Sequence, residues 1–226
     1  MKTIFKKYGF TIYSFVAIVH LIAIVFEQED VRFITKPLLM PLLALAVYGC
    51  SAAGRERTII ITAIFFSLLG DSFLLFDYLN PLYFIFGLIS FLITHILYIV
   101  YFIGIKPLHT SLLKIYPWII VLVVGYGVGL VYFLYPKLGD LKIPVIVYAV
   151  IICSMLLAAI HIFKRVKAIA GWLLVAGAVF FVVSDSLLAI NKFHSAFSGA
   201  AFLIMFTYCA AQYCIAKGFT KAGNSI

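Results

Sequence analysis

The most regular feature of this chain is a series of long apolar stretches, each followed by a short polar or charged segment. Eight stretches can be marked out: Tyr8–Phe26, Pro37–Ala53, Thr58–Phe76, Pro81–Ile105, Ile115–Tyr135, Ile143–Phe163, Ala168–Ile190 and Ser195–Ala216. Each is close to the ~20 residues that a helix needs to cross a bilayer core. The stretches are too long for barrel strands and lack a period of two. They therefore predict eight transmembrane helices.

Composition supports this prediction, because 65% of the 226 residues are hydrophobic and only 11% are charged. Such a chain cannot cover itself with polar surface as a soluble domain does. The connections are too short to hold a further domain, so we expect one all-α, polytopic membrane domain over residues 1–226. Lys2, Lys6 and Lys7 before an apolar run are also typical of a secretory signal. No small-residue cleavage pattern follows Phe26, however, and we keep this stretch as the first helix.

The distribution of Lys and Arg predicts the orientation in the membrane. With the N-terminus inside, 12 of the 17 basic residues fall on the cytoplasmic side. The five on the opposite side are Arg32, Lys36, Lys137, Lys142 and Lys192. This bias predicts that both termini are cytoplasmic. The net charge of +9 is then explained by topology and anionic lipid, and no nucleic-acid partner is expected.

The positions of the four cysteines do not predict disulfide bonds. Cys50, Cys153, Cys209 and Cys214 all fall within predicted helices, without a metal-ligand spacing and without a position in an outward loop. We therefore interpret them as small apolar packing residues.

Two carboxylates interrupt the apolar stretches, and they are the only ones that we place outside the loops. Asp71 lies in "FFSLLGDSFLLF" and Asp185 in "FFVVSDSLLAI", each followed by a serine. A carboxylate in the hydrocarbon region costs at least ~2.5 kcal/mol and usually marks function. Each precedes the predicted outer end of its helix by five residues, which places both roughly 8 Å below the outer boundary. Their separation of 114 residues, about half the chain, suggests two four-helix halves related by a parallel repeat.

Other polar residues are expected at the same depth as the two aspartates. Lys36 begins the second predicted helix, and Tyr148 lies five residues into the sixth. The alternatives are a snorkelling lysine for Lys36 and an interfacial aromatic residue for Tyr148. Ser184 and Ser186 flank Asp185, with hydrogen bonds to their own helix as the alternative role, which also applies to Ser72.

A deeper polar layer is predicted from three further residues. His95 belongs to a stripe on one helical face, formed by Phe84, Gly87, Phe91, His95 and Tyr98. It lies roughly 21 Å below the outer boundary, and Tyr208 and Gln212, one turn apart, lie at a similar level. The alternative role for this group is hydrogen bonding between helices.

Taken in order, these residues resemble the YhhN family of multipass membrane proteins, which includes the mammalian TMEM86 lysoplasmalogenases. The resemblance spans most of the chain and is carried by Lys36-Pro37-Leu38, Gly70-Asp71, the stripe from Phe84 to Tyr98, Pro144 with Tyr148, Gly177-Ala178, Ser184-Asp185-Ser186, and Tyr208 with Ala211-Gln212. It implies an eight-helix membrane hydrolase that cleaves the vinyl ether bond of lysoplasmalogens. The products would be a fatty aldehyde and a glycerophospho-headgroup, and the substrate a membrane lysophospholipid. In a bacterium the location would be the inner membrane.

The chemistry of that reaction suits paired carboxylates, because a vinyl ether hydrolyses by protonation of its β-carbon to an oxocarbenium ion. Asp71 and Asp185 are the candidate catalytic residues, one as acid and the other as stabilising anion, without a cofactor. Candidates for substrate binding are Lys36, Tyr148, Ser184, Ser186, His95, Tyr208 and Gln212, with Lys36 on the headgroup phosphate. The sequence leaves open which aspartate is the acid, the headgroup and the oligomeric state.

Two other functions remain open from the sequence. Buried carboxylates in repeated halves are also typical of a proton-coupled transporter. A metal-dependent lipid hydrolase would use histidines with an aspartate to activate water. Its membrane candidates are His20, His95 and His161, but no pair of histidines has a ligand spacing such as i, i+4.

Overall fold

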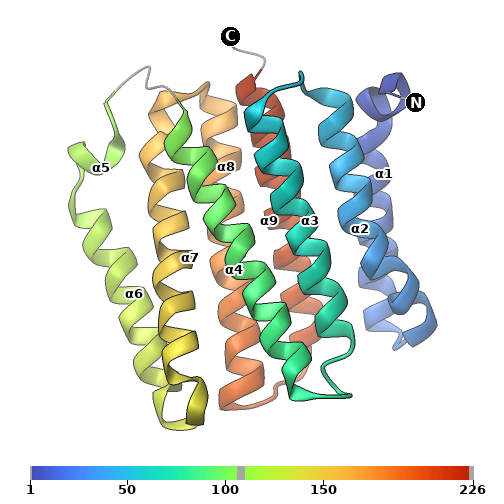
Figure 1. Ribbon diagram of the computed structural model, residues 1–226, viewed down its shortest axis with the longest axis vertical. Coiled ribbons are helices and arrows are strands. Elements are labelled where there is room, and N and C mark those ends of the chain that lie inside the picture. The colour runs from blue at the N-terminus through green and yellow to red at the C-terminus, as the bar shows by residue number, and fades with distance from the viewer. Residues whose placement is uncertain (1, 106–109, 224–226) are drawn as a thin grey trace. The chain divides into compact units, whose positions relative to one another are not determined.

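The computed structural model describes residues 2–105 and 110–223, and within these ranges the backbone is almost entirely helical (Figure 1). The long helices are α1 (Lys2–Val25), α2 (Glu29–Cys50), α3 (Arg55–Leu75), α4 (Pro81–Gly104), α6 (Trp118–Leu134), α7 (Lys142–Ile162), α8 (Ala168–Ala189) and α9 (Ala200–Gly223). A short α5 (Leu112–Ile115) precedes α6. Eight helices in the described residues are long and apolar enough to cross a membrane. The prediction of an all-α, multi-pass membrane protein is therefore confirmed.

The chain divides into two compact units. One contains residues up to Tyr101 and therefore α1, α2, α3 and most of α4; the other runs from Phe102 to Ala222 and contains α5 to α8 and nearly all of α9.

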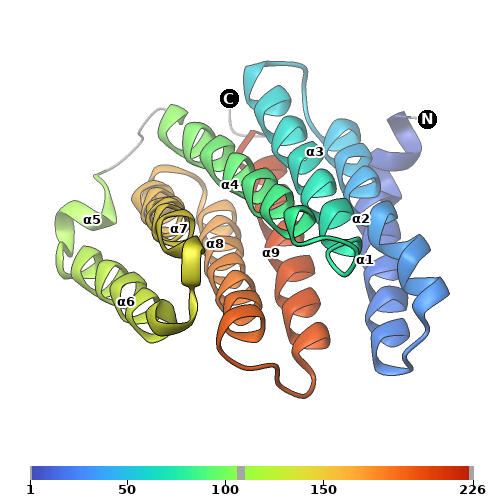
Figure 2. The same cartoon turned by 60° about the horizontal axis from the view of Figure 1, so that its bottom comes forward.

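In the unit that contains α1 to α4, small residues set the distances between neighbouring helices. A Cβ on Gly9 of α1 would lie 2.8 Å from the Cα of Ala46, so α1 and α2 pack with their backbones close together (Figure 2). Between α3 and α4, a Cβ on Gly70 would meet the ring of Phe91 at 2.7 Å. Gly87 of α4 faces Leu74 and the carbonyl oxygen of Gly70, so α3 and α4 also approach closely there.

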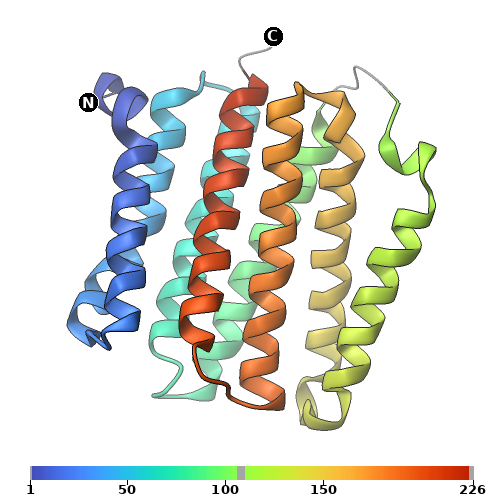
Figure 3. The same ribbon diagram turned by 180° about the vertical axis from the view of Figure 1, so that it is seen from behind.

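Small residues also allow α8 and α9 to pack closely in the other unit. A Cβ on Gly177 would lie 2.9 Å from both the carbonyl oxygen of Ala211 and the backbone nitrogen of Ile215. These two helices run side by side in Figure 3. The rings of Phe181 and Tyr208 meet edge to face across the same interface, with centroids 5.7 Å apart. Small residues thus replace the hydrophobic effect, which cannot drive helix association inside lipid.

The predicted start of the second helix was wrong. We placed it at Pro37, because the second apolar stretch begins there. Instead α2 begins at Glu29 and contains both Pro37 and Pro41 in its interior. Membrane helices tolerate such prolines, since neighbouring groups can satisfy the freed carbonyls. Lys36 therefore lies seven residues after the helix start, about 10 Å along its axis.

Two further boundaries need correction. The last helix begins at Ala200 rather than Ser195 and continues to Gly223. The helix that carries Asp185 does not end at Ile190, because a π-helical turn continues it from Ile190 to His194. The prediction that all other carboxylates lie in loops is confirmed for Glu27 and Asp77 but was wrong for Glu29, Asp30 and Glu56. Glu29 and Asp30 form the first turn of α2 and Glu56 lies in the first turn of α3, where acidic side chains complement the helix dipole.

Candidate active site

The clearest polar contact inside the apolar helices joins α7 to α8. The hydroxyl group of Tyr148 donates a hydrogen bond of 2.5 Å to Oδ2 of Asp185. Both side chains are half-buried. The sequence predicted that these two residues lie at a similar depth, and the hydrogen bond shows that they also meet. A phenol that donates to a carboxylate stabilises its ionised form and fixes its orientation.

A second hydrogen-bonded pair lies beside the first. The hydroxyl group of Tyr126, on α6, donates to Oγ of Ser186 at 2.7 Å. Ser186 in turn donates to the carbonyl oxygen of Val182 at 2.6 Å, as expected for a serine bonded to its own helix. Sequence reasoning missed Tyr126. Its only signal is a phenol among the small and apolar residues of Gly125–Gly129, which gives no periodic pattern.

These polar groups surround a small cavity of about 40 Å³ between α6, α7 and α8. Its polar lining residues are Tyr126, Tyr148, Asp185 and Ser186. Most of its other lining residues are aliphatic, including Leu134 and Val145 of a buried cluster. The site thus combines one carboxylate and three hydroxyl groups with mostly apolar surroundings, in which electrostatic interactions act strongly.

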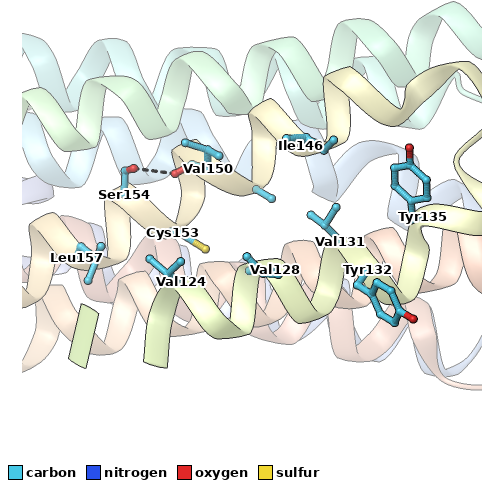
Figure 4. A pocket seen from close by; sticks show the side chains of 12 residues that line it. Val124, Val128, Val131, Tyr132, Tyr135, Ile146, Val150, Cys153, Ser154 and Leu157 are labelled. Atoms are coloured by element: carbon cyan, nitrogen blue, oxygen red, sulfur yellow. Dashed lines mark hydrogen bonds between the residues drawn. The ribbon is translucent and has the colours of Figure 1, made fainter. Parts of the chain in front are cut away.

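A larger groove of about 580 Å³ follows the outer seam between α6 and α7 (Figure 4). Its lining is aliphatic apart from Tyr132, Tyr135, Cys153 and Ser154. Four residues line both the groove and the small cavity: Gly127, Val131, Ala149 and Cys153. The two spaces therefore share a wall built mainly from small side chains.

The remaining candidates in this unit make contacts at the α8–α9 interface. Ser184 donates to the carbonyl oxygen of Ile204 at 3.0 Å, across to α9 rather than within its own helix. The side-chain nitrogen of Gln212 lies 3.5 Å from the hydroxyl oxygen of Tyr208, and both residues are buried. Ser184 therefore bonds between helices, although the alternative expected for it was a bond to its own helix. The Gln212–Tyr208 contact lies within α9, although the alternative expected for these residues was a bond between helices.

The other candidates belong to the unit that contains α1 to α4. Asp71 is 2% exposed and His95 is fully buried, while Lys36 is half-buried. All five residues of the α4 stripe from Phe84 to Tyr98 are buried, so the predicted face is confirmed. Since Asp71 and Asp185 belong to different units, their pairing stays a prediction.

The described residues contain no group of three or more His, Cys, Asp or Glu side chains that could hold a metal ion. Nδ1 of His20 lies 2.7 Å from the hydroxyl oxygen of Thr35, which itself donates to the carbonyl of Val31. This contact occupies Nδ1 of His20, whichever of the two groups donates. In the described part of the chain, none of the four cysteines forms a disulfide.

Fold and site together define the class: a multi-pass helical membrane protein with a carboxylate held by a phenol inside its apolar helices. The comparisons with known proteins then give the family. The profile described as the YhhN family matches residues 31–219, and the chain belongs to that family.

Three curated relatives carry the name lysoplasmalogenase. Lysoplasmalogenase TMEM86A of Bos taurus is 38% identical over 178 residues, which cover 76% of this chain and 69% of the relative. Lysoplasmalogenase TMEM86A of Homo sapiens is 35% identical over 79% of this chain and 72% of its own length. The lysoplasmalogenase of Mycobacterium tuberculosis (strain CDC 1551 / Oshkosh) is 31% identical over 80% of this chain and 67% of its own length. No solved structure matches the chain.

Proposed function

We propose that this protein is a membrane lysoplasmalogenase, which hydrolyses the vinyl ether bond of lysoplasmalogens to a fatty aldehyde and a glycerophospho-headgroup. Family membership and three curated relatives of that name support the reaction. The observation that carries the mechanism is the hydrogen bond from Tyr148 to Asp185 beside an apolar groove.

The reaction needs an acid, an anion and a water molecule. A proton is added to the β-carbon of the vinyl ether, and the resulting oxocarbenium ion has its positive charge shared between the α-carbon and the ether oxygen. Water attacks the α-carbon and loses a proton, which gives a hemiacetal. Collapse of the hemiacetal then releases the aldehyde and the glycerol hydroxyl group. No redox step or cofactor is required by this balance.

We assign the anionic role to Asp185. The phenol of Tyr148 fixes the orientation of the Asp185 carboxyl group through a direct hydrogen bond. A carboxylate in dry surroundings stabilises a developing cation more strongly than it would in water. The same carboxylate can orient the attacking water and accept its proton.

We assign the acid role to Asp71, which is nearly completely buried. It is the second carboxyl group that interrupts an apolar helix, and protonation of the β-carbon requires a proton donor of that kind. Lys36 remains our candidate for the headgroup phosphate. Ser184, Ser186, His95, Tyr208 and Gln212 remain candidates for substrate binding. Ser184 and Ser186 donate hydrogen bonds to backbone carbonyls, and Gln212 contacts Tyr208.

The decisive experiment is aldehyde detection with purified protein and lysoplasmalogen. Asp185→Asn and Asp71→Asn keep the side-chain shape but cannot donate a carboxylic proton or offset positive charge. Each should lower turnover by ~100-fold or more, since general acid–base catalysis is typically worth that much. The double variant should be little worse than either single variant, because the residues act in the same step.

The controls separate this proposal from its alternatives. The substituted proteins must reach the membrane and purify like the wild type. If both single variants hydrolyse lysoplasmalogen at the wild-type rate, the carboxylate mechanism is wrong. If the wild type releases no aldehyde but moves solute into sealed vesicles with a proton gradient, the transporter is the correct function instead.

A further inference from the structure

The groove between α6 and α7 has the dimensions of one lipid chain. Its lining on α6 runs from Val124 to Tyr135, which is roughly 16 Å along a helix. One leaflet occupies about half of the ~30 Å hydrocarbon core, so this length equals the depth that a single chain reaches. The volume of about 580 Å³ also lies within the range of small-ligand sites.

Lysine and aromatic side chains lie at the end of the groove nearest the Tyr148–Asp185 pair. At that end α6 finishes, and the ammonium group of Lys142 lies 4.7 Å from the centre of the Tyr135 ring. Lys137 lies in the same turn and donates a hydrogen bond of 2.8 Å to the carbonyl oxygen of His194. Lysines and a tyrosine at a helix end are typical of the membrane–water interface.

The opposite end of the groove is apolar. Figure 4 shows Val124 and Leu157 at that end, far from Tyr135 and Ile146. Ser154 lies nearby, but its hydroxyl group donates to the carbonyl of Val150 in its own helix at 2.7 Å. The groove therefore leads from a basic interface into an apolar interior, which is the arrangement of an anionic headgroup followed by one chain.

The reactive carboxylate lies next to the part of the groove nearest this basic end. Tyr148 is six residues from Lys142, about 9 Å along α7. In a lysoplasmalogen the vinyl ether joins the first two chain carbons to glycerol, so the reacting bond lies just below the headgroup. The depth of the Tyr148–Asp185 pair thus matches the depth of that bond.

Small side chains separate the groove from the cavity that Asp185 lines. Gly127 and Ala149 line both spaces. A Cβ on Gly127 would lie 2.8 Å from Sγ of Cys153, so α6 and α7 touch there with no space for a larger residue. At this seam the groove adjoins the cavity that Asp185 lines.

We propose that the α6–α7 groove binds the single aliphatic chain of the lysolipid substrate, with the phosphate at the Lys137–Lys142 end and the vinyl ether beside Asp185. This inference rests on the proposed function and names the chain subsite of the same active site. Because bilayer chains are as apolar as the groove, the groove gains little affinity from burial and acts by orienting the chain. Chain length, rather than total hydrophobicity, should then decide the rate.

A matched pair of substitutions tests this subsite. Val150 lines the groove, whereas Val147, one turn away on the same helix, is exposed and does not line it. Val150→Trp should block the inner half and reduce kcat/KM for a long-chain lysoplasmalogen by about 10-fold or more, the effect of a misfit in an apolar pocket. It should leave a vinyl ether of a few carbons unaffected, because that chain ends before Val150. Val147→Trp should change neither rate.

A binding measurement decides the question without any turnover. A saturated alkyl lysophospholipid with a photoreactive group at the chain end should label the groove near Val124 and Leu157 of the wild type, and lysoplasmalogen should compete for this labelling. Uniform labelling of all lipid-facing helices would identify ordinary bilayer lipid and overturn the proposal. So would cross-links to a second copy of the chain through this groove, or equal rate losses for Val150→Trp and Val147→Trp.

The two proposals fail in different ways. If the wild type releases no aldehyde from long or short vinyl ethers, the proposed function is wrong, while competed labelling by the alkyl lysolipid still establishes the chain site. If the wild type hydrolyses both ethers but the groove is not labelled, the function holds and the chain binds elsewhere.

Discussion

Replacing Tyr148 by phenylalanine removes one oxygen atom and tests how much of the catalysis depends on the positioning of Asp185. The hydrogen bond between them is 2.5 Å long and involves a charged acceptor. Hydrogen bonds to charged groups contribute about 1.5–3 kcal/mol. If this contribution is fully expressed in the transition state, turnover should fall by about 10- to 150-fold, since 1.4 kcal/mol corresponds to a factor of ten.

The assay is aldehyde release under saturating lysoplasmalogen, with kcat and KM determined separately. We expect the loss in kcat, because Tyr148 holds the carboxylate rather than the lipid chain. Tyr78→Phe is the matched control, because Tyr78 is 74% exposed and lies in the turn after α3. In the Asp185→Asn background the same Tyr148→Phe change should cost much less than in the wild type, because both substitutions remove the same contact. A Tyr148→Phe protein that folds and keeps the full kcat would refute the reasoning.

Three further predictions concern the metal, the topology and the packing. Hydrolysis should survive strong chelators, measured by aldehyde release; a loss that one added metal restores would favour the metal-dependent hydrolase. A cysteine at Asn80 should react with an impermeant thiol reagent from outside the cell, and labelling only from the inside would reverse the predicted orientation. Gly177→Ala should lower the free energy of unfolding by about 1–3 kcal/mol, because its Cβ would meet the α9 backbone. Gly129→Ala, with nothing within 4 Å, should not destabilise the detergent-solubilised protein, and equal melting temperatures for the two variants would contradict this packing.

The number and type of helices could be predicted from the sequence because lipid imposes one rule on every span. Inside lipid, the backbone N–H and C=O groups of a span must hydrogen-bond to one another, so each long apolar stretch has to be a helix. The start of α2 could not be predicted by the same rule. Pro37 has the sequence signature of a helix start, but Glu29 and Asp30 begin the helix at the polar surface. Because α2 begins at Glu29, Lys36 lies inside the helix and not at its start.

The candidate site was predictable where one polar residue interrupts an apolar run. Asp185 and Tyr148 stand out for this reason. Counting residues along their two helices placed them at a similar depth, and the structure shows the hydrogen bond between them. Tyr126 could not be found in this way, because tyrosines are ordinary in membrane helices and only the rotation of α6 places its hydroxyl group on Ser186. The groove between α6 and α7 could not be predicted from the sequence either. It depends on how closely α6 and α7 approach at Gly127 and Cys153, which is a property of two segments together.

The groove is bounded by side chains that are themselves open to the surroundings, since Val128 is 64% and Val150 is 59% exposed. In a bilayer these surroundings are lipid, so a substrate that binds there arrives sideways, by diffusion within the leaflet. The concentration that such an enzyme experiences is a mole fraction in the membrane and not an amount per volume of water. Adding inert phospholipid at a fixed total amount of substrate should therefore slow the reaction as strongly as removing substrate would.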